Sequence, residues 1–508
     1  MPVPPLSLTS PWLSPMSTTA HPKRPHYNVT FVVLSLGAIS YALLQSLVLP
    51  ALPEMQHALH TSESAVTWVL TAYLLSASVA TPIIGRLGDM YGKERLLLIV
   101  LVALAVGTLV SALSSSIGLM VLGRVVQGAG GGIFPLAFGI IRDEFPRRRV
   151  AGAIGLMSSL LGIGGGAGVV LAGPIAQHLS YHWLYWFPLV AIVVAIVATH
   201  RFVPESPIKV PGRVNWLGAA LMSAGLTAVL LAVSEATVWG WGSPKMLGLT
   251  AAGAILLVAW VASELRAAEP LVDMRMMRIR GVWTTNLVAA LLGVGMYSSF
   301  ILIPQLVQEP RSTGYGFGAT VTAAGVFLLP ATLAMLVMGQ FAGRLERRFG
   351  SKPPLIGGAA FTTASFTLLV VGHGDRAIIY LSSGLLGLGI GLAFAAMANL
   401  IVDNVRQDQT GVATGMNTVV RTLGGALGAQ VAATFLANDL GARGLPTANA
   451  FTLAFAMCAV AIAAGLGVCF LIPGRRRTMV APAGLDAGRE DAPAGSVPAG
   501  VVEANLGG

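Results

Sequence analysis

Fourteen stretches of mostly apolar residues follow one another along this chain of 508 residues. Each is about 20 residues long, the length at which an α-helix crosses the hydrocarbon core of a bilayer. Only 10% of the residues are charged and 55% are hydrophobic, whereas a soluble domain carries about 25% charged residues. The sequence therefore predicts an all-α integral membrane protein with 14 spans. We place the spans near 31–50, 66–85, 96–114, 117–141, 151–176, 183–203, 214–234, 246–264, 284–308, 318–343, 354–372, 377–402, 411–437 and 450–473.

The basic residues divide unevenly between the two sides of such a protein. A net charge of +10 would by itself fit a nucleic-acid-binding protein, but 25 of the 31 Lys and Arg residues fall on one side of the spans, 4 on the other and 2 inside. The cytoplasmic side of a membrane protein is the one enriched in Lys and Arg. We therefore expect no nucleic-acid partner, and a multi-pass protein of the cell inner (plasma) membrane with both termini in the cytoplasm.

The two ends of the chain lack the pattern of the spans. Residues 1–30 have no basic segment followed by an apolar one, so we expect a cytoplasmic tail and not a cleaved signal peptide, with either Met1 or Met16 as the start. Residues 474–508 are rich in Ala, Gly, Pro and acidic residues without periodicity, which predicts a second disordered tail.

A short motif occurs twice. The segment 85–95, GRLGDMYGKER, joins two apolar stretches, and a degraded copy, GRLERRFGSK, begins 258 residues later at Gly343. Glycines at 128, 130 and 132 likewise match glycines at 387, 389 and 391, at an offset of 259. The repeat predicts a duplicated six-helix unit, with an N-terminal half over 31–203, a C-terminal half over 284–473, and two inserted spans with their linkers over 204–283.

The segment 85–95 resembles the cytoplasmic loop motif of the major facilitator superfamily, and the six-two-six plan resembles the fourteen-span drug:proton antiporters of that superfamily. The resemblance implies a major facilitator fold that works by alternating access. In that family the loop aspartate pairs with neighbouring charges and with a facing helix N-terminus, which locks the outward-open state. The candidate gating residues are accordingly Gly85, Asp89, Gly92, Lys93, Arg95, Arg142 and Asp143.

Two arginines lie well inside predicted spans, where a charge costs about 2.5 to 3.5 kcal/mol on insertion scales. Arg124 belongs to the segment 120–128, MVLGRVVQG, which resembles the family's fourth-span motif L-x-x-x-R-x-x-Q-G. The resemblance implies that Arg124 and Gln127 take part in proton coupling, and the alternative is a structural hydrogen-bond hub.

The second arginine, Arg421, follows Asn417 by four residues, which places both on one face of the thirteenth span. If that face is the inner one, both side chains look into a central cavity between the halves. Arg421 then contacts substrate or serves as a structural anchor. We select the cavity-lining candidates as polar or aromatic groups inside spans: Gln45, Tyr297, Asn417 and Arg421.

Acidic groups are missing from the middle of the spans. None of the 21 Asp and Glu residues and none of the 8 His residues falls there, and Leu44 stands where related fourteen-span exporters commonly carry Asp. A membrane enzyme or receptor built on an intramembrane acidic or histidine cluster is therefore disfavoured. A cation-selective pocket is disfavoured as well, because nothing anionic is present to pair with the cation.

These observations predict an efflux transporter, driven by the proton gradient, for small amphipathic compounds that are neutral or anionic. The alternative is a dedicated exporter of a single metabolite or antibiotic. We expect no metal and no cofactor. The expected partners are the small-molecule substrate, protons and membrane lipid, and the protein is expected to function as a monomer.

Overall fold

The computed structural model describes residues 26–206, 209, 213–441 and 444–473. The predicted tails and the choice of start residue lie outside these ranges, apart from residues 26–30. His26 caps the first helix, α1 (Tyr27–Ser46), so this helix begins four residues before the predicted span.

Fourteen helical spans of sufficient length and apolarity are present among the described residues, which confirms the predicted number. The long helices after α1 are α3 (Glu63–Tyr91), α4 (Lys93–Leu113), α5 (Ile117–Gln127) with α6 (Ile133–Glu144), α7 (Arg147–His178), α8 (Trp183–Phe202), α9 (Trp216–Ser234), α11 (Pro244–Arg266), α13 (Arg280–Gln308), α14 (Val321–Phe349), α15 (Lys352–Gly372), α16 (Arg376–Asn404), α17 (Thr410–Asn438) and α18 (Ala448–Leu471). Three short helices, α2 (Leu52–Ala58), α10 (Ala236–Trp239) and α12 (Met274–Met277), lie in the connections. A 3-10 turn over Gly128–Gly132 joins α5 to α6, and these three pieces form one span.

The motif at 85–95 is almost entirely helical, which differs from the predicted loop. Helix α3 continues to Tyr91, six residues beyond the predicted end of the span, and α4 starts at Lys93. The chain reverses at the single residue Gly92, whose φ of +116° suits glycine. Gly350, at the same place in the second copy, ends α14 with a φ of +78°.

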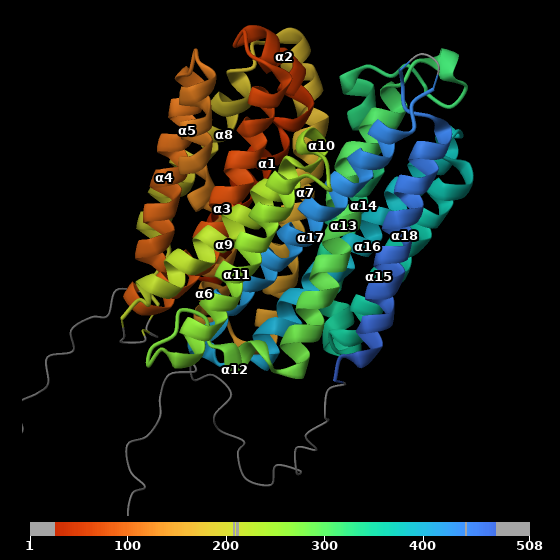
Figure 1. Ribbon diagram of the computed structural model, residues 1–508. Helices are drawn as coiled ribbons and strands as arrows, with labels where there is room; N and C mark the ends of the chain where they lie inside the picture. Colours follow the sequence, from red (N-terminus) through yellow and green to blue (C-terminus); the bar gives the residue numbers. More distant parts are fainter. Residues whose placement is uncertain (1–25, 207–208, 210–212, 442–443, 474–508) are drawn as a thin grey trace, which may run out of the picture.

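The two halves stand side by side, with α9 and α11 placed between them in the view of Figure 1. We call the end of the bundle at Gly92 the basic end and the opposite end the far end. Both ends of the described chain lie at the basic end, because the ring of Tyr27 packs 5.4 Å from that of Phe145 and Lys352 Nζ donates to the carbonyl of Ile472 at 2.6 Å. An even number of spans requires this arrangement.

Glycines bring the halves together at two symmetry-related places at the basic end. A Cβ on Gly85 of α3 would lie 2.6 Å from the carbonyl oxygen of Gly411 of α17. A Cβ on Gly343 of α14 would lie 2.5 Å from the Cα of Gly152 of α7. Small residues allow membrane helices to pack at backbone distance. The duplicated sequence thus builds one close contact on each side of the boundary between the halves.

The inserted segment packs on both halves. Helix α9 lies against α11, α3 and α17. Near the far end Trp241 Nε1 donates to Thr434 Oγ1 at 2.7 Å, and at the basic end Gln409 Nε2 donates to Asp273 Oδ2 at 3.3 Å. The segments that connect the inserted spans are therefore hydrogen-bonded to α17, or to the residue just before it, at both ends of the bundle.

Candidate functional site

Arg124 lies in a fully buried polar cluster inside the N-terminal half. Its Nε donates to the carbonyl of Val69 at 2.8 Å, and its Nη1 donates to the carbonyl of Leu44 at 3.2 Å and to Gln127 Oε1 at 2.7 Å. Gln127 in turn donates from Nε2 to the hydroxyl of Ser111 at 3.2 Å. Arg124 and Gln127 therefore form one unit, as the motif predicts, although their part in proton coupling stays a prediction.

The end of helix α1 offsets part of the charge of Arg124, whose Nη2 has no hydrogen-bond partner. That helix stops at Ser46, so the carbonyl of Leu44 lies in the last turn, where carbonyl groups have no helical partner and carry partial negative charge. The ring of Tyr73 adds a cation–π contact, with its centroid 4.3 Å from the guanidinium carbon. Among the described residues no carboxylate is paired with Arg124. At position 44, where related exporters commonly carry Asp, the backbone carbonyl of Leu44 accepts the hydrogen bond from Arg124.

Two small adjoining cavities lie between the halves, each with a volume of about 20 Å³, which is room for a single water molecule. The N-terminal half contributes α1, α3, α6 and α7 to their walls, and the C-terminal half contributes α13, α16 and α17. The four predicted lining residues border one or both cavities: Gln45, Tyr297, Asn417 and Arg421. Their contact with a substrate is untested.

Two of these four residues connect the halves directly. Gln45 Nε2 of α1 donates to Tyr297 Oη of α13 at 3.2 Å. Asn417 Nδ2, in contrast, donates to Asn286 Oδ1 at 2.9 Å inside the C-terminal half. The pair of Gln45 and Tyr297 must therefore separate if this part of the boundary opens, whereas Asn417 moves with its own half.

Arg421 is the charged residue of both cavities, and it is 7% exposed. Its guanidinium carbon lies 4.5 Å from the ring centroid of Phe394, and its Nε has no hydrogen-bond partner. None of the described residues that line the two cavities is acidic. The cavities therefore present a positive charge that no nearby carboxylate neutralises.

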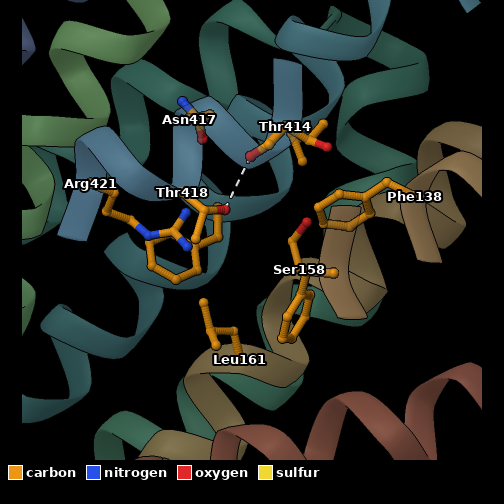
Figure 2. Close-up of a pocket in the computed structure, with 10 residues that line it drawn as sticks. Phe138, Ser158, Leu161, Thr414, Asn417, Thr418 and Arg421 are labelled. Carbon is orange, nitrogen blue, oxygen red and sulfur yellow. Dashed lines mark hydrogen bonds between the residues drawn. The ribbon is translucent and has the colours of Figure 1, made fainter. Parts of the chain in front are cut away.

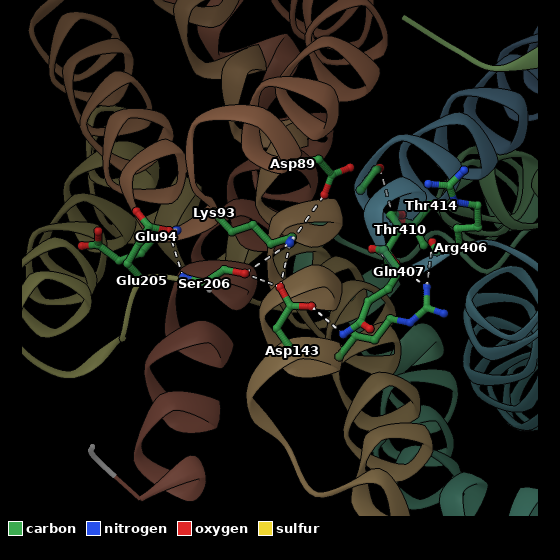
Figure 3. Close-up of polar contacts among 12 residues, drawn as sticks. Asp89, Lys93, Glu94, Asp143, Glu205, Ser206, Arg406, Gln407, Thr410 and Thr414 are labelled. Carbon is green, nitrogen blue, oxygen red and sulfur yellow. Dashed lines mark hydrogen bonds and ion pairs between the residues drawn. The ribbon is translucent and has the colours of Figure 1, made fainter. Parts of the chain in front are cut away.

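A second polar cluster closes the basic end, shown in Figure 3. Lys93 Nζ lies 2.7 Å from Asp143 Oδ2 and 3.6 Å from Asp89 Oδ1, and all three side chains are 1% exposed. The hydroxyl of Ser206 accepts a hydrogen bond from Lys93 at 3.4 Å and donates one to Asp143. Gly139 leaves room for the lysine, since a Cβ there would lie 2.6 Å from Lys93 Cε. The predicted partners Asp89, Lys93 and Asp143 are thus brought together.

This cluster also reaches the C-terminal half. Arg142 donates to the carbonyls of Val405 at 3.0 Å and Arg406 at 3.1 Å, just after α16, and to Thr410 Oγ1 at the start of α17. Gln407 Nε2 donates to Asp143 Oδ1 at 3.2 Å. The first turn of α17 faces the carboxylate of the neighbouring α3, because a Cβ on Gly411 would lie 3.1 Å from Asp89 Oδ2. A negative charge is favoured at a helix N-terminus.

Arg95 is the predicted gating residue that does not join the cluster. Its side chain is 71% exposed, and its Nε lies 3.7 Å from Glu205 Oε2 at the surface. Exposed ion pairs of this kind contribute about 0 to 1 kcal/mol. Gly92 makes space for the same glutamate, since a Cβ there would lie 2.4 Å from Glu205 Oε2.

The structure adds residues that the sequence analysis did not select. Ser206 and Gln407 donate to Asp143, and Thr410 accepts from the neighbouring Arg142. A second group of contacts between the halves, which we call the second seam, involves α7, α14 and α16. There Asn399 Nδ2 of α16 donates to the carbonyl of Ala151 of α7 at 3.0 Å and to Glu346 of α14. Glu346 lies in the degraded copy of the motif, a signal from which this position could have been found. The halves are therefore held together at the basic end in two places, the cluster around Asp143 and the second seam.

We expect Asn399→Ala to weaken the second seam. The change removes the donor from the buried carboxylate of Glu346 and from the carbonyl of Ala151, and a buried group that loses its partner costs about 1 to 3 kcal/mol. Thermal unfolding in detergent should show lower stability. The control is Asn404→Ala on the same helix, since Asn404 donates to its own helix at Leu400. Equal stability of the two variants would contradict a bond across the halves.

Comparison with known proteins identifies a family of membrane transporters. A family model described as Major Facilitator Superfamily matches residues 34–429. The chain is 28% identical over 416 residues to the tetracenomycin C resistance and export protein of Streptomyces glaucescens, covering 81% of this chain and 76% of that protein. It is 26% identical over 369 residues to the multidrug transporter protein MdtP of Bacillus subtilis, covering 72% and 67%.

Among solved structures, the human organic anion transporter MFSD10 (TETRAN) has the same fold, with a TM-score of 0.63 and 16% identity over 88% of this chain and 100% of that one. A family model that matches most of the chain, together with 14 spans, identifies a multi-pass membrane transporter of small molecules and not an enzyme. The chain belongs to the Major Facilitator Superfamily.

Proposed function

We propose that this transporter exports small amphipathic compounds, neutral or anionic, by alternating access driven by the proton gradient. The observation that carries the proposal is Arg421, a buried cation in the cavities between the halves without an acidic residue beside it in the described lining. A monocation 4 Å from this charge would be repelled by about 4 kcal/mol at an effective dielectric constant of 20. An anion gains a similar attraction, and a neutral molecule pays no such cost.

The closed basic end supports alternating access. Hydrogen bonds of Arg142 and Asp143 attach the N-terminal half to the end of α16 and the turn before α17, and Asp89 faces the first turn of α17. The cavities lie deeper between the halves. Releasing these contacts would admit a substrate from the basic end, which the positive-inside rule assigns to the cytoplasm. We place the protein in the plasma membrane as a monomer surrounded by lipid, with its termini in the cytoplasm.

Proton coupling in this proposal involves two places. Arg124 and Gln127 form a buried hub in the N-terminal half, and a fixed positive charge of this kind tunes a nearby protonation event without releasing a proton itself. The carboxylates of Asp89 and Asp143 lie at the basic end and belong to the contacts that must open.

Transport into everted membrane vesicles tests the proposal. With the pH gradient imposed, anionic and neutral amphiphiles are expected to accumulate more than quaternary ammonium dyes of similar size. Collapsing the gradient should stop accumulation. Strong transport of ethidium-like monocations, or transport that ignores the pH gradient, would refute the corresponding part of the proposal.

A dedicated exporter of one antibiotic is the second candidate. The similarity to a protein named for tetracenomycin C resistance and export favours it, and the similarity to a multidrug transporter favours the broader function. Resistance profiles in a strain without its own efflux pumps distinguish them, since a dedicated exporter protects against one compound class only.

Orientation is a separate prediction. Cysteine placed at Arg95, which is exposed at the basic end, should resist an impermeant thiol reagent added to intact cells. Cysteine placed at Arg311, exposed at the far end, should react rapidly. The native Cys458 and Cys469 are buried, so background labelling is expected to be low. Equal labelling at both introduced positions would contradict the assigned topology.

A further inference from the structure

The hydroxyl groups of the cavity next to Arg421 point their protons away from it. Ser158 Oγ donates to the carbonyl of Ile154 at 2.8 Å. Thr414 Oγ1 donates to the carbonyl of Thr410 at 2.7 Å, and Thr418 Oγ1 donates to that of Thr414 at 3.1 Å. A hydroxyl has one proton and two lone pairs. These three side chains, all of which line the cavity, therefore offer acceptors to a ligand.

The donor in this cavity is Arg421. Asn417, on the same wall, directs Nδ2 to Asn286 outside the cavity lining, whereas Arg421 keeps a buried Nε without a partner. Figure 2 shows Arg421 and Ser158 reaching from different helices toward the same space, with Thr418 between them. The polar surface thus combines one cationic donor with several neutral acceptors.

The rest of the lining is mostly aromatic. Phe134 and Phe138 from α6 and Phe394 from α16 surround the space, together with Leu161. Aromatic rings pack favourably face to edge or in offset stacks. The guanidinium of Arg421 lies 4.5 Å from the centroid of the Phe394 ring, so an anionic group bound to Arg421 would come close to this aromatic wall.

We propose that the residues around this cavity form a binding site for hydroxylated aromatic acids once the halves separate, in which a carboxylate or phenolate oxygen of the ligand pairs with Arg421 and a ring hydroxyl donates to Ser158. The inference rests on the proposed export function and narrows its substrate class. It follows from a donor–acceptor pattern that matches a ligand carrying both an anionic oxygen and a separate hydroxyl proton. An aliphatic acid would lack the ring contacts, and an aromatic cation would be repelled.

Calorimetric titration of the full chain in detergent tests the site with four probes that share a naphthalene ring. They are 6-hydroxy-2-naphthoate, 6-methoxy-2-naphthoate, 2-naphthoate and the cation (2-naphthylmethyl)trimethylammonium. The hydroxy acid is expected to bind about five- to tenfold more tightly than the methoxy acid, the gain typical of one hydrogen bond. The cation is expected to show no binding.

Three variants assign the contacts. Arg421→Gln should weaken all the naphthoates by about tenfold or more, since bonds to charged groups are the stronger ones. Ser158→Ala should remove the preference for the hydroxy acid and leave 2-naphthoate unchanged. Ser159→Ala is the matched control, because Ser159 donates to Leu156 and does not line the cavity.

Equal affinity for the hydroxy and methoxy acids, or unchanged naphthoate binding in Arg421→Gln, overturns the proposed site. Proteoliposome transport separates this failure from that of the export function. Selective naphthoate binding without transport of any amphiphile would support the site and refute export. Export of other amphiphiles without a preference for naphthoates in binding would support export and refute the site.

Discussion

Arg124→Ala is expected to abolish proton-driven export while substrate binding is retained. The guanidinium satisfies the buried carbonyls of Val69 and Leu44 and the amide oxygen of Gln127, yet Arg124 does not line either cavity between the halves. Each buried acceptor that loses its partner costs about 1 to 3 kcal/mol. We therefore expect lower stability, loss of coupling and an intact cavity.

Arg124→Lys should rescue poorly, because an ammonium group cannot reproduce the planar fork that reaches Val69, Leu44 and Gln127 together. The measurements are ligand binding to purified protein and efflux with and without a pH gradient, with the exposed Arg311→Ala as control. Equal loss of binding and transport in Arg124→Ala would assign Arg124 to the substrate site. Full activity of Arg124→Lys would show that charge alone suffices.

The number and placement of the spans were predictable because a bilayer leaves a chain few choices. Backbone groups in hydrocarbon must bond within their own helix, so each span needs a long apolar stretch. The ends of the spans were less predictable where polar sequence stays helical. Helix α3 runs through Asp89 to Tyr91, and the buried Asp89 pairs there with Lys93, the first residue of α4. A hydropathy pattern does not contain that pairing.

The two arginines of the spans were identifiable for the same reason, since a charge in an apolar stretch is rare and costly. Gln407 and Asn399 were not, because they are ordinary polar residues at helix ends. Gln407 bonds with Asp143, 264 residues away, and Asn399 bonds with Ala151, 248 residues away. Such pairs exist only once the halves are docked.

Arg95 was selected from the motif, but its side chain lies outside the cluster around Lys93. Lys93 and Arg95 are two positions apart on helix α4, and residues at that spacing do not share a helix face. Lys93 faces inward to Asp143, so Arg95 faces the solvent. The motif shows only that Lys93 and Arg95 are close in sequence. Which of them faces the cluster depends on the helix that starts after Gly92.

Asp89→Asn is expected to leave the protein folded and inserted but to impair transport strongly. The substitution removes the negative charge that faces the first turn of α17 at Gly411, while Lys93 keeps its shorter contact with Asp143 at 2.7 Å. A charge at a helix N-terminus contributes about 0.3 to 1 kcal/mol, and up to about 2 when partly buried. One to two kcal/mol corresponds to about a 5- to 30-fold change in an equilibrium, so the closed basic end should be less populated by that factor.

Lys93→Met should be worse, because it leaves two buried carboxylates without their cation, and breaking a buried pair costs about 3 to 5 kcal/mol. Initial export rates and size-exclusion profiles measure both effects. Asp375→Asn is the matched control: it removes an exposed aspartate that caps α16 at the far end, so it tests charge loss at a helix N-terminus away from the gate. Normal export by Asp89→Asn would mean that the motif acts only as a topology signal. Slow export by Asp89→Asn but not by Asp375→Asn, with an unchanged elution profile, would show that the charge of Asp89 takes part in opening and closing the basic end.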